Sequence, residues 1–234
     1  MSSLSNFQIT KRWPPKYPDR LQLYSLPTPN GVKVSIMLEE TGLPYEAHRV
    51  DFDKKDQKTP EFMSLNPNGR IPAIIDPDGQ GGVVVPLFES GAILQYLADK
   101  TGKLIPADPA RRWETIQWLH WQMSAVGPMF GQVGYFNKFA GKEIADKRPL
   151  QHYAAQSKSL LDLMDARLEA RTWMMGEDFT IADISLLGWV RNLIGYYEAR
   201  GLVAFDTLKR VPDWLERSMA RPAVKRGLAI PAKA

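Results

Sequence analysis

The chain has 234 residues, of which 44% are hydrophobic and 24% charged, so it can bury a substantial core and differs in composition from disordered proteins. It contains no cysteine, which excludes disulfide frameworks, thiolate–zinc sites and a cysteine nucleophile. The formal net charge of +4 comes without a dense basic stripe, and neither an apolar secretion segment nor a membrane-spanning run is present. We therefore expect a cytoplasmic protein that binds neither nucleic acid nor membrane.

The first twenty residues are polar and contain three prolines, so we expect an extension that lies along the surface or is partly mobile. Residues 21–25 alternate in polarity like a strand, and from residue 30 the apolar spacing becomes helical. Gly42 follows that pattern, where a glycine typically ends a helix. Residues 45–50 predict a second strand and residues 59–65 a short helix.

Two short apolar runs, at 71–75 and 83–88, flank a cluster of turn-forming residues and predict an antiparallel hairpin. Ser90 then begins a further helix. The predicted order is β-α-β-α-β-β-α, in which the helix between the first two strands implies that they are parallel. Beyond residue 102 the pattern is helical almost throughout, with a kink expected at Pro128.

This order predicts a small α/β domain followed by an all-helical domain. The expected division is an N-terminal extension at 1–20, the α/β domain at 21–102, a linker at 103–110, the helical domain at 111–222 and a tail at 223–234.

Three junctions in the first domain could carry chemistry. Thr28-Pro29-Asn30-Gly31 lies between the first strand and the first helix, where ligands of α/β sheets commonly bind and where helix N–H groups are unpaired. The Thr28 hydroxyl and the Asn30 amide could donate hydrogen bonds to an anion there. In the alternative interpretation, Thr28 or Asn30 caps the helix and Gly31 eases the turn.

The second junction is Ile71-Pro72, where a cis peptide bond would turn the Ile71 backbone outward to pair with a peptide-like ligand. A tight turn into the strand is the alternative. At the third junction, Glu89 and the helix start at Ser90 could hold the ammonium and carboxylate of an amino acid, or Ser90 could be only an N-cap. Together the three junctions predict a pocket for a small, charged, peptide-like molecule.

The segments NGRIPAI and FESGAILQYLA, in this order of elements, resemble the glutathione transferase superfamily. TPNG, WLHWQ and GPMFGQ make the chain similar to its nu class, the bacterial disulfide-bond reductase type, over about residues 21–227. The implied fold is a thioredoxin-like N-terminal domain followed by an all-helical C-terminal domain. Thr180-Ile-Ala-Asp183 resembles the superfamily's N-capping box, which we interpret as structural.

The resemblance implies glutathione as a bound co-substrate, and no metal. It assigns eight positions to glutathione: Thr28 and Asn30 at the sulfur, Gln57 at the glycyl end with Arg70 near it, the Ile71 backbone before a cis Pro72 at the cysteinyl unit, and Glu89 and Ser90 at the γ-glutamyl group. Where the class often carries an arginine before a tyrosine, this chain has His152, and whether His152 takes over a ligand contact stays open.

A free thiol has a pKa near about 8.5, and lowering it by about two units requires a preference of roughly 2.7 kcal/mol for the thiolate. Two hydrogen bonds to the charged sulfur can supply this, since each contributes about 1.5–3 kcal/mol. Tyr24 and Ser25 lie within the predicted strand and are interpreted as structural. Thr28 and Asn30 could therefore activate a glutathione thiol without an ionisable catalyst.

The implied function is a glutathione-dependent disulfide-bond reductase with weaker transferase or peroxidase activity. Because the chain has no cysteine, both electrons must come from glutathione. Conjugation of electrophiles, or reduction of organic peroxides, is the alternative activity. A non-catalytic glutathione-binding regulator would need an Asn/Gln-rich extension, which residues 1–20 lack. The implied partners are a small disulfide or electrophile and a second copy of the chain in a homodimer.

Overall fold

The computed structural model describes residues 4–232, which form two compact units. The first unit combines the chain up to Lys103 with the segment from Pro222 onward, and the second unit is Leu104–Arg221. From the sequence, residues 223–234 were predicted to be a separate tail. In the structure the described part of that tail belongs to the first unit.

A four-stranded mixed sheet forms the centre of the first unit, in the order β2-β1-β3-β4. β2 is parallel to β1, whereas β3 is antiparallel to both β1 and β4. The order of strands and helices confirms the predicted thioredoxin-like arrangement. The elements are β1 (Leu21–Ser25), α1 (Gly31–Thr41), β2 (Tyr45–Arg49), α2 (Pro60–Met63), β3 (Ala73–Asp76), β4 (Val85–Phe88) and α3 (Ser90–Thr101).

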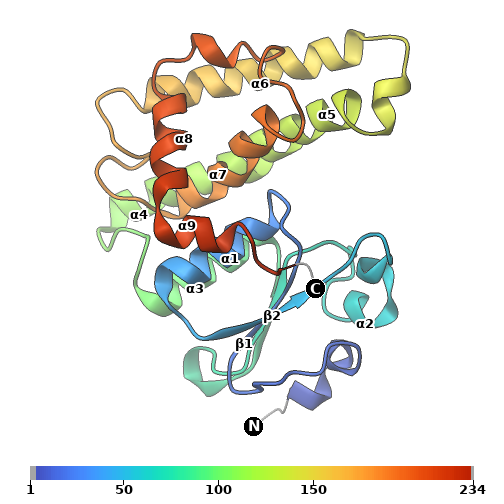
Figure 1. Ribbon diagram of the computed structural model, residues 1–234. Helices are drawn as coiled ribbons and strands as arrows, with labels where there is room; N and C mark the ends of the chain where they lie inside the picture. Colours follow the sequence, from blue (N-terminus) through green and yellow to red (C-terminus); the bar gives the residue numbers. More distant parts are fainter. Residues whose placement is uncertain (1–3, 233–234) are drawn as a thin grey trace. The chain divides into compact units, whose positions relative to one another are not determined.

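Helices cover the two faces of this sheet: α1 and α3 pack together on one side of the strands, and α2 lies on the other side (Figure 1). Successive strand residues point to opposite faces. On the α2 side, Tyr24, Ala73 and Ile75 pack in one buried cluster with Phe62 of α2.

The N-terminal segment, residues 4–20, contributes to that same core. It contains two short 3-10 helices, η1 (Leu4–Asn6) and η2 (Gln8–Lys11). Ile9 is fully buried in the cluster with Tyr24 and Phe62, and Phe7 and Trp13 pack against it. The expectation was an extension that lies along the surface or is partly mobile; the structure instead packs Leu4, Phe7, Ile9 and Trp13 into the core cluster, while Tyr17 stays exposed.

The C-terminal helix α9 (Pro222–Gly227) packs on α1 and thereby joins the first unit. The Ser35 hydroxyl donates to the Gly227 carbonyl at 2.6 Å, and a side chain at Gly227 would lie 2.7 Å from the Ile36 backbone. Arg226 pairs with Glu39 at 2.5 Å. This close backbone approach explains why the tail packs with the first unit.

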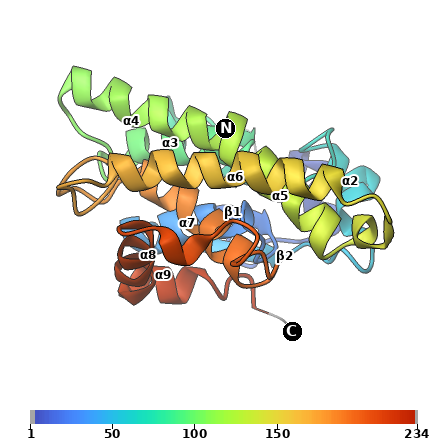
Figure 2. The ribbon, with the colours of Figure 1, turned by 90° about the horizontal axis from the view of Figure 1, so that it is seen from above.

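The second unit is helical, as predicted, and in it α5 and α6 run side by side (Figure 1 and Figure 2). A π-helical segment at Gln122–Val126 separates α4 from α5 directly before Pro128, which has no N–H to continue the helical bonding. Within residues 4–232 no helix has the length and apolar character to cross a membrane. The α-helices of the second unit are α4 (Pro109–Trp121), α5 (Gly127–Asn137), α6 (Arg148–Arg167), α7 (Ile181–Ile194) and α8 (Val211–Ala220).

The start of α7 confirms the predicted capping box. The Thr180 hydroxyl accepts from the Ala182 N–H at 3.3 Å, and the Asp183 carboxylate accepts from the Thr180 N–H at 3.1 Å. Both side chains are buried, so the box stabilises the central helix of this unit from inside its core.

Candidate functional site

The register of the sheet brings the three predicted junctions to one edge. Tyr24 of β1 pairs with Ala73 of β3, and Ala73 pairs with Phe88 of β4. These three residues form a row across the sheet, so the segments that continue from them lie at the same edge. Those segments are the Thr28 turn after β1, Ile71-Pro72 before β3 and Glu89-Ser90 after β4.

The loop after β2 reaches this edge as well, because β2 is parallel to β1 and Arg49 pairs with Ser25. The loop carries Gln57. Gly69, with φ 60°, lies so close to the Gln57 carbonyl that a side chain there would approach it to 2.8 Å. The next residue, Arg70, is exposed. All eight residues predicted from the sequence therefore belong to segments that meet at one end of the sheet.

Thr28 holds the turn that begins α1. Its hydroxyl oxygen accepts from the Gly31 N–H at 3.2 Å and its carbonyl from the Val32 N–H at 3.0 Å. A side chain at Gly31 would meet the Leu26 carbonyl at 1.9 Å, which explains why glycine occupies this position. Because the hydroxyl accepts in its bond with Gly31, its own hydrogen is not used there and can be donated to an anion. Thr28 can thus hold the turn before α1 and bind a ligand at the same time.

The Asn30 side chain does not make a capping hydrogen bond to α1. It lies one residue before a helix N-terminus, where the partial positive charge of the helix favours an anion. The helix start, the Thr28 hydroxyl and the Asn30 amide are therefore all suited to a negatively charged atom.

The second junction has the predicted geometry: the Ile71–Pro72 peptide bond is cis. The third differs from the prediction in one respect. Glu89, not Ser90, occupies the N-cap position of α3, and its φ of 70° is unusual for a residue with a side chain. Ser90 is already helical and only 3% exposed. Backbone strain of this kind is concentrated at functional sites, and here it presents an exposed carboxylate beside a helix N-terminus.

A buried lysine that was not predicted from the sequence contacts this junction. Lys33 on α1 is fully buried, and its ammonium nitrogen lies 3.3 Å from the Ser90 hydroxyl oxygen. Burial lowers the pKa of Lys33 from 10.5 to about 7, against the opposing effect of Glu89. The available signal was one charged residue inside the otherwise apolar stretch GVKVSIML. Lys33 adds a titratable positive charge behind the predicted γ-glutamyl end.

This pKa predicts a specific dependence of stability on pH. The unfolded chain keeps Lys33 protonated up to about pH 10, whereas the folded chain releases the proton above about pH 7, so stability rises with pH across that window. Lys33→Met should remove up to about 1.4 kcal/mol per pH unit from the slope. Urea unfolding at a series of pH values measures it, with exposed Lys54→Met as the control. An unchanged slope in Lys33→Met would contradict the assignment.

Two residues interpreted as structural are indeed in the core. Tyr24 and Ser25 are fully buried, and burial, with the charge of Glu46 adding to it, raises the pKa of the Tyr24 phenol. Tyr24 therefore stays un-ionised and cannot act as the base that activates a thiol. His152, in the second unit, is exposed and packs edge-on against Tyr153 at 5.3 Å between ring centroids.

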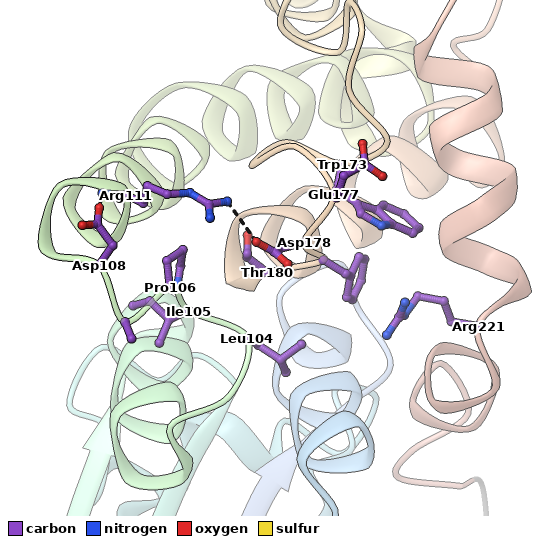
Figure 3. A pocket seen from close by; sticks show the side chains of 12 residues that line it. Leu104, Ile105, Pro106, Asp108, Arg111, Trp173, Glu177, Asp178, Thr180 and Arg221 are labelled. Atoms are coloured by element: carbon purple, nitrogen blue, oxygen red, sulfur yellow. Dashed lines mark hydrogen bonds and ion pairs between the residues drawn. The ribbon is translucent and has the colours of Figure 1, made fainter.

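A separate cavity of about 490 Å³ lies within the second unit and contains none of the eight predicted residues (Figure 3). Arg111 pairs with Asp178 across it at 2.9 Å, and the Arg221 guanidinium stacks 4.1 Å from the Phe179 ring centroid. Arg111 and Arg221 therefore already have interaction partners in the helical unit. The cavity is distinct from the candidate glutathione-binding segments of the first unit. Within residues 4–232 no cluster of three or more His, Asp or Glu side chains is arranged to hold a metal ion.

The fold and this edge of the sheet define a known class of protein. Residues 19–99 match the glutathione S-transferase N-terminal domain, and residues 149–226 match its C-terminal domain. The chain belongs to the glutathione S-transferase family, as the resemblance implied.

Particular relatives narrow this comparison. The chain is 39% identical to disulfide-bond oxidoreductase YfcG of Escherichia coli over 209 residues, covering 89% of this chain and 94% of the relative. A glutathione transferase of Burkholderia graminis, solved with two glutathione molecules per subunit, is 63% identical with a TM-score of 0.98, over 100% of this chain and 98% of that one. A Pseudomonas putida glutathione transferase, solved with one glutathione disulfide per subunit, is 60% identical with a TM-score of 0.97, over 99% and 100%.

Proposed function

We propose that this protein is a glutathione-dependent disulfide-bond reductase in which Thr28 and Asn30 stabilise the thiolate of bound glutathione. The observation that carries the proposal is the Thr28 turn: a hydroxyl that already accepts from the Gly31 N–H, at the N-terminus of α1, in a chain without cysteine. Such a turn can donate to a thiolate but cannot itself be oxidised or reduced. The redox-active sulfur therefore belongs to the ligand.

The remaining predicted residues hold the rest of glutathione in this proposal. The Ile71 backbone beside the cis Pro72 pairs with the cysteinyl unit, and Gln57 binds the glycyl end, with Arg70 adding positive charge. Ser90 and the N–H groups of α3 bind the γ-glutamyl carboxylate, while Glu89 binds the ammonium. Lys33 adds a cationic group near Ser90, in addition to Arg70 near the glycyl end.

The reaction consumes two glutathiones for each disulfide reduced. The first glutathione thiolate attacks one sulfur of the substrate disulfide, which forms a mixed disulfide and releases one substrate thiolate that takes up a proton. A second glutathione thiolate attacks the glutathione sulfur of the mixed disulfide, which forms glutathione disulfide and releases the other substrate thiolate, which also takes up a proton. Each glutathione gives up one electron, so the two electrons that the substrate gains are accounted for.

The relatives support this stoichiometry. The Burkholderia graminis protein was solved with two glutathione molecules per subunit and the Pseudomonas putida protein with one glutathione disulfide, which correspond to the two glutathiones consumed and the oxidised product of the overall reaction. The name of the Escherichia coli relative, a disulfide-bond oxidoreductase, favours the same reaction. For this chain we propose room for two glutathiones at the edge of the sheet.

Conjugation of electrophiles is the second candidate, because the same thiolate would attack an aryl halide, and the solved relatives are named glutathione transferases. A side-by-side assay of glutathione with bis(hydroxyethyl) disulfide and with chlorodinitrobenzene separates the two. We expect kcat/KM for the disulfide to exceed that for the halide by at least about tenfold. A larger kcat/KM for the halide would reverse the order of the two functions, and binding of glutathione without turnover of either would favour a regulator.

A homodimer and a cytoplasmic location complete the proposal. The cytosol keeps glutathione reduced, which supplies the electrons for this reaction. Sedimentation equilibrium of the purified chain tests the dimer: a mass of twice 26.5 kDa is expected, and a monomer at micromolar concentration would contradict it.

A further inference from the structure

The N-terminal segment contacts the chain at the point where β2 leads into the loop that carries Gln57. The Trp13 indole N–H donates to the carbonyl of Arg49, the last residue of β2, at 3.0 Å. The Trp13 ring also packs edge-on against Tyr24 and Phe62, with centroids 5.9 and 6.3 Å apart. This segment is therefore held beside the loop at residues 50–59 by both packing and a hydrogen bond.

Arg12, the neighbour of Trp13, forms an ion pair with Asp56 in that loop. Asp56 is only 5% exposed, and its second carboxylate oxygen accepts from the Asp51 N–H at 2.9 Å. The Asp56 N–H donates back to the Asp51 carbonyl at 3.0 Å. Asp56 thus stabilises the loop by two hydrogen bonds with Asp51 and connects it to the N-terminal segment by the ion pair with Arg12. Without Arg12 it would be a buried carboxylate that has lost its cationic partner, which is costly.

Gln57 follows Asp56 directly and carries an unsatisfied polar atom. Its side-chain oxygen is buried and accepts no hydrogen bond among the described residues. A buried polar atom without a partner costs free energy. The residue that carries it lies in the loop after β2, where the Gln57 backbone carbonyl is close to Gly69. An N–H group of a ligand would satisfy it. The amide N–H of a glycyl unit is such a donor.

We propose that Arg12 is a positioning residue for the glycyl end of glutathione, acting through Asp56 to hold Gln57 in place. The inference rests on the proposed function, in which Gln57 binds that end. It gives the N-terminal segment a role in ligand affinity, since its ion pair fixes the residue that precedes Gln57. The cysteinyl and γ-glutamyl ends are held by other segments and do not depend on Arg12.

Calorimetric titration of two thiols tests this. Glutathione has the glycyl unit, and γ-glutamylcysteine lacks it but keeps the rest. We expect Arg12→Met to weaken glutathione binding about tenfold, in line with loss of a charge-assisted contact, and to leave γ-glutamylcysteine binding unchanged. In turnover, KM for glutathione should rise while kcat stays the same. Arg12→Lys, which keeps the charge, should recover part of the affinity.

The matched control is Lys11→Met, which removes the same charge from the adjacent exposed residue and should change neither titration. Asp56→Asn should resemble Arg12→Met, and the double variant should be no worse than either, because both changes break one interaction. If Arg12→Met weakens both thiols equally, or neither, the positioning role is overturned and Arg12 serves stability alone.

The same titrations separate this inference from the proposed function. Gln57→Ala should weaken glutathione but not γ-glutamylcysteine. If it does so while Arg12→Met has no effect, only the role of Arg12 is overturned. If the unaltered protein binds both thiols equally, the assignment of Gln57 fails and the positioning role is overturned with it.

Discussion

Replacing Thr28 by valine is expected to lower kcat/KM for glutathione-dependent disulfide reduction by about 10- to 100-fold. Valine keeps the branched shape but has no hydroxyl to donate to the glutathione thiolate. One hydrogen bond to a charged atom contributes about 1.5–3 kcal/mol, and 1.36 kcal/mol corresponds to about one pKa unit or a factor of ten in rate. The loss should appear in kcat at saturating glutathione, measured with a small disulfide at neutral pH.

Thr28→Ser is the matched control, because it keeps the hydroxyl and should retain most of the activity. Thr28 also accepts from the Gly31 N–H, so Thr28→Val should lose about 0.5–2 kcal/mol of stability, a loss similar to that of a capping hydrogen bond. Urea unfolding measures the loss of stability by itself. Activity is then compared at a low temperature at which Thr28→Val remains folded, so that any loss of kcat comes from the missing hydroxyl. Full kcat in a folded Thr28→Val would show that the hydroxyl does not act on the sulfur.

Replacing Asp183 by asparagine is expected to cost about 2–3 kcal/mol of folding stability, because buried donors would lose their hydrogen bonds to a charged group. Asp183 is fully buried, and its carboxylate accepts from the Met174 N–H at 2.9 Å, the Trp214 indole N–H at 2.9 Å and the Thr180 N–H at 3.1 Å. Burial raises the pKa of Asp183 to about 6, against the opposing effect of these donors. An asparagine would keep one acceptor oxygen, but its NH2 group would replace the other and face the donors on that side.

Urea unfolding of the whole protein measures this cost, and Asp213→Asn is the control because it changes the same group at an exposed position beside Trp214. Trp214→Phe, which removes one donor and keeps an aromatic ring, should cost less than Asp183→Asn but more than the control. Stability of Asp183→Asn within about 1 kcal/mol of the original protein would contradict this account of the α7 cap.

The order of elements could be predicted because local signals agreed. Turn formers and alternating apolar runs marked each strand of the sheet, and the Thr180–Asp183 box was visible at its characteristic spacing. The site could be predicted as far as its segments, since it lies at strand–helix junctions. The strand register, which pairs Tyr24, Ala73 and Phe88 in one row, brings the three predicted junctions together at one end of the sheet.

What the sequence did not show depends on contacts between distant segments. The N-terminal segment has three prolines and a polar surface, and only the structure reveals that Ile9 fills the core beside Tyr24. The tail likewise packs on α1 through Gly227, and no local sequence pattern around Gly227 predicts this contact. Lys33 was missed because charged residues on a helix are normally solvated, and its burial follows from the packing of α1 against α3.

The pKa of the bound glutathione thiol tests the central claim most directly. Thiolate absorbance in the ultraviolet, followed against pH with glutathione bound to the protein, reports this value without any turnover. We predict a thiol pKa about two units below the free value of about 8.5, and a return of about one unit or more toward it in Thr28→Val. A bound thiol that titrates at the free value in both proteins would contradict thiolate stabilisation by the Thr28 turn.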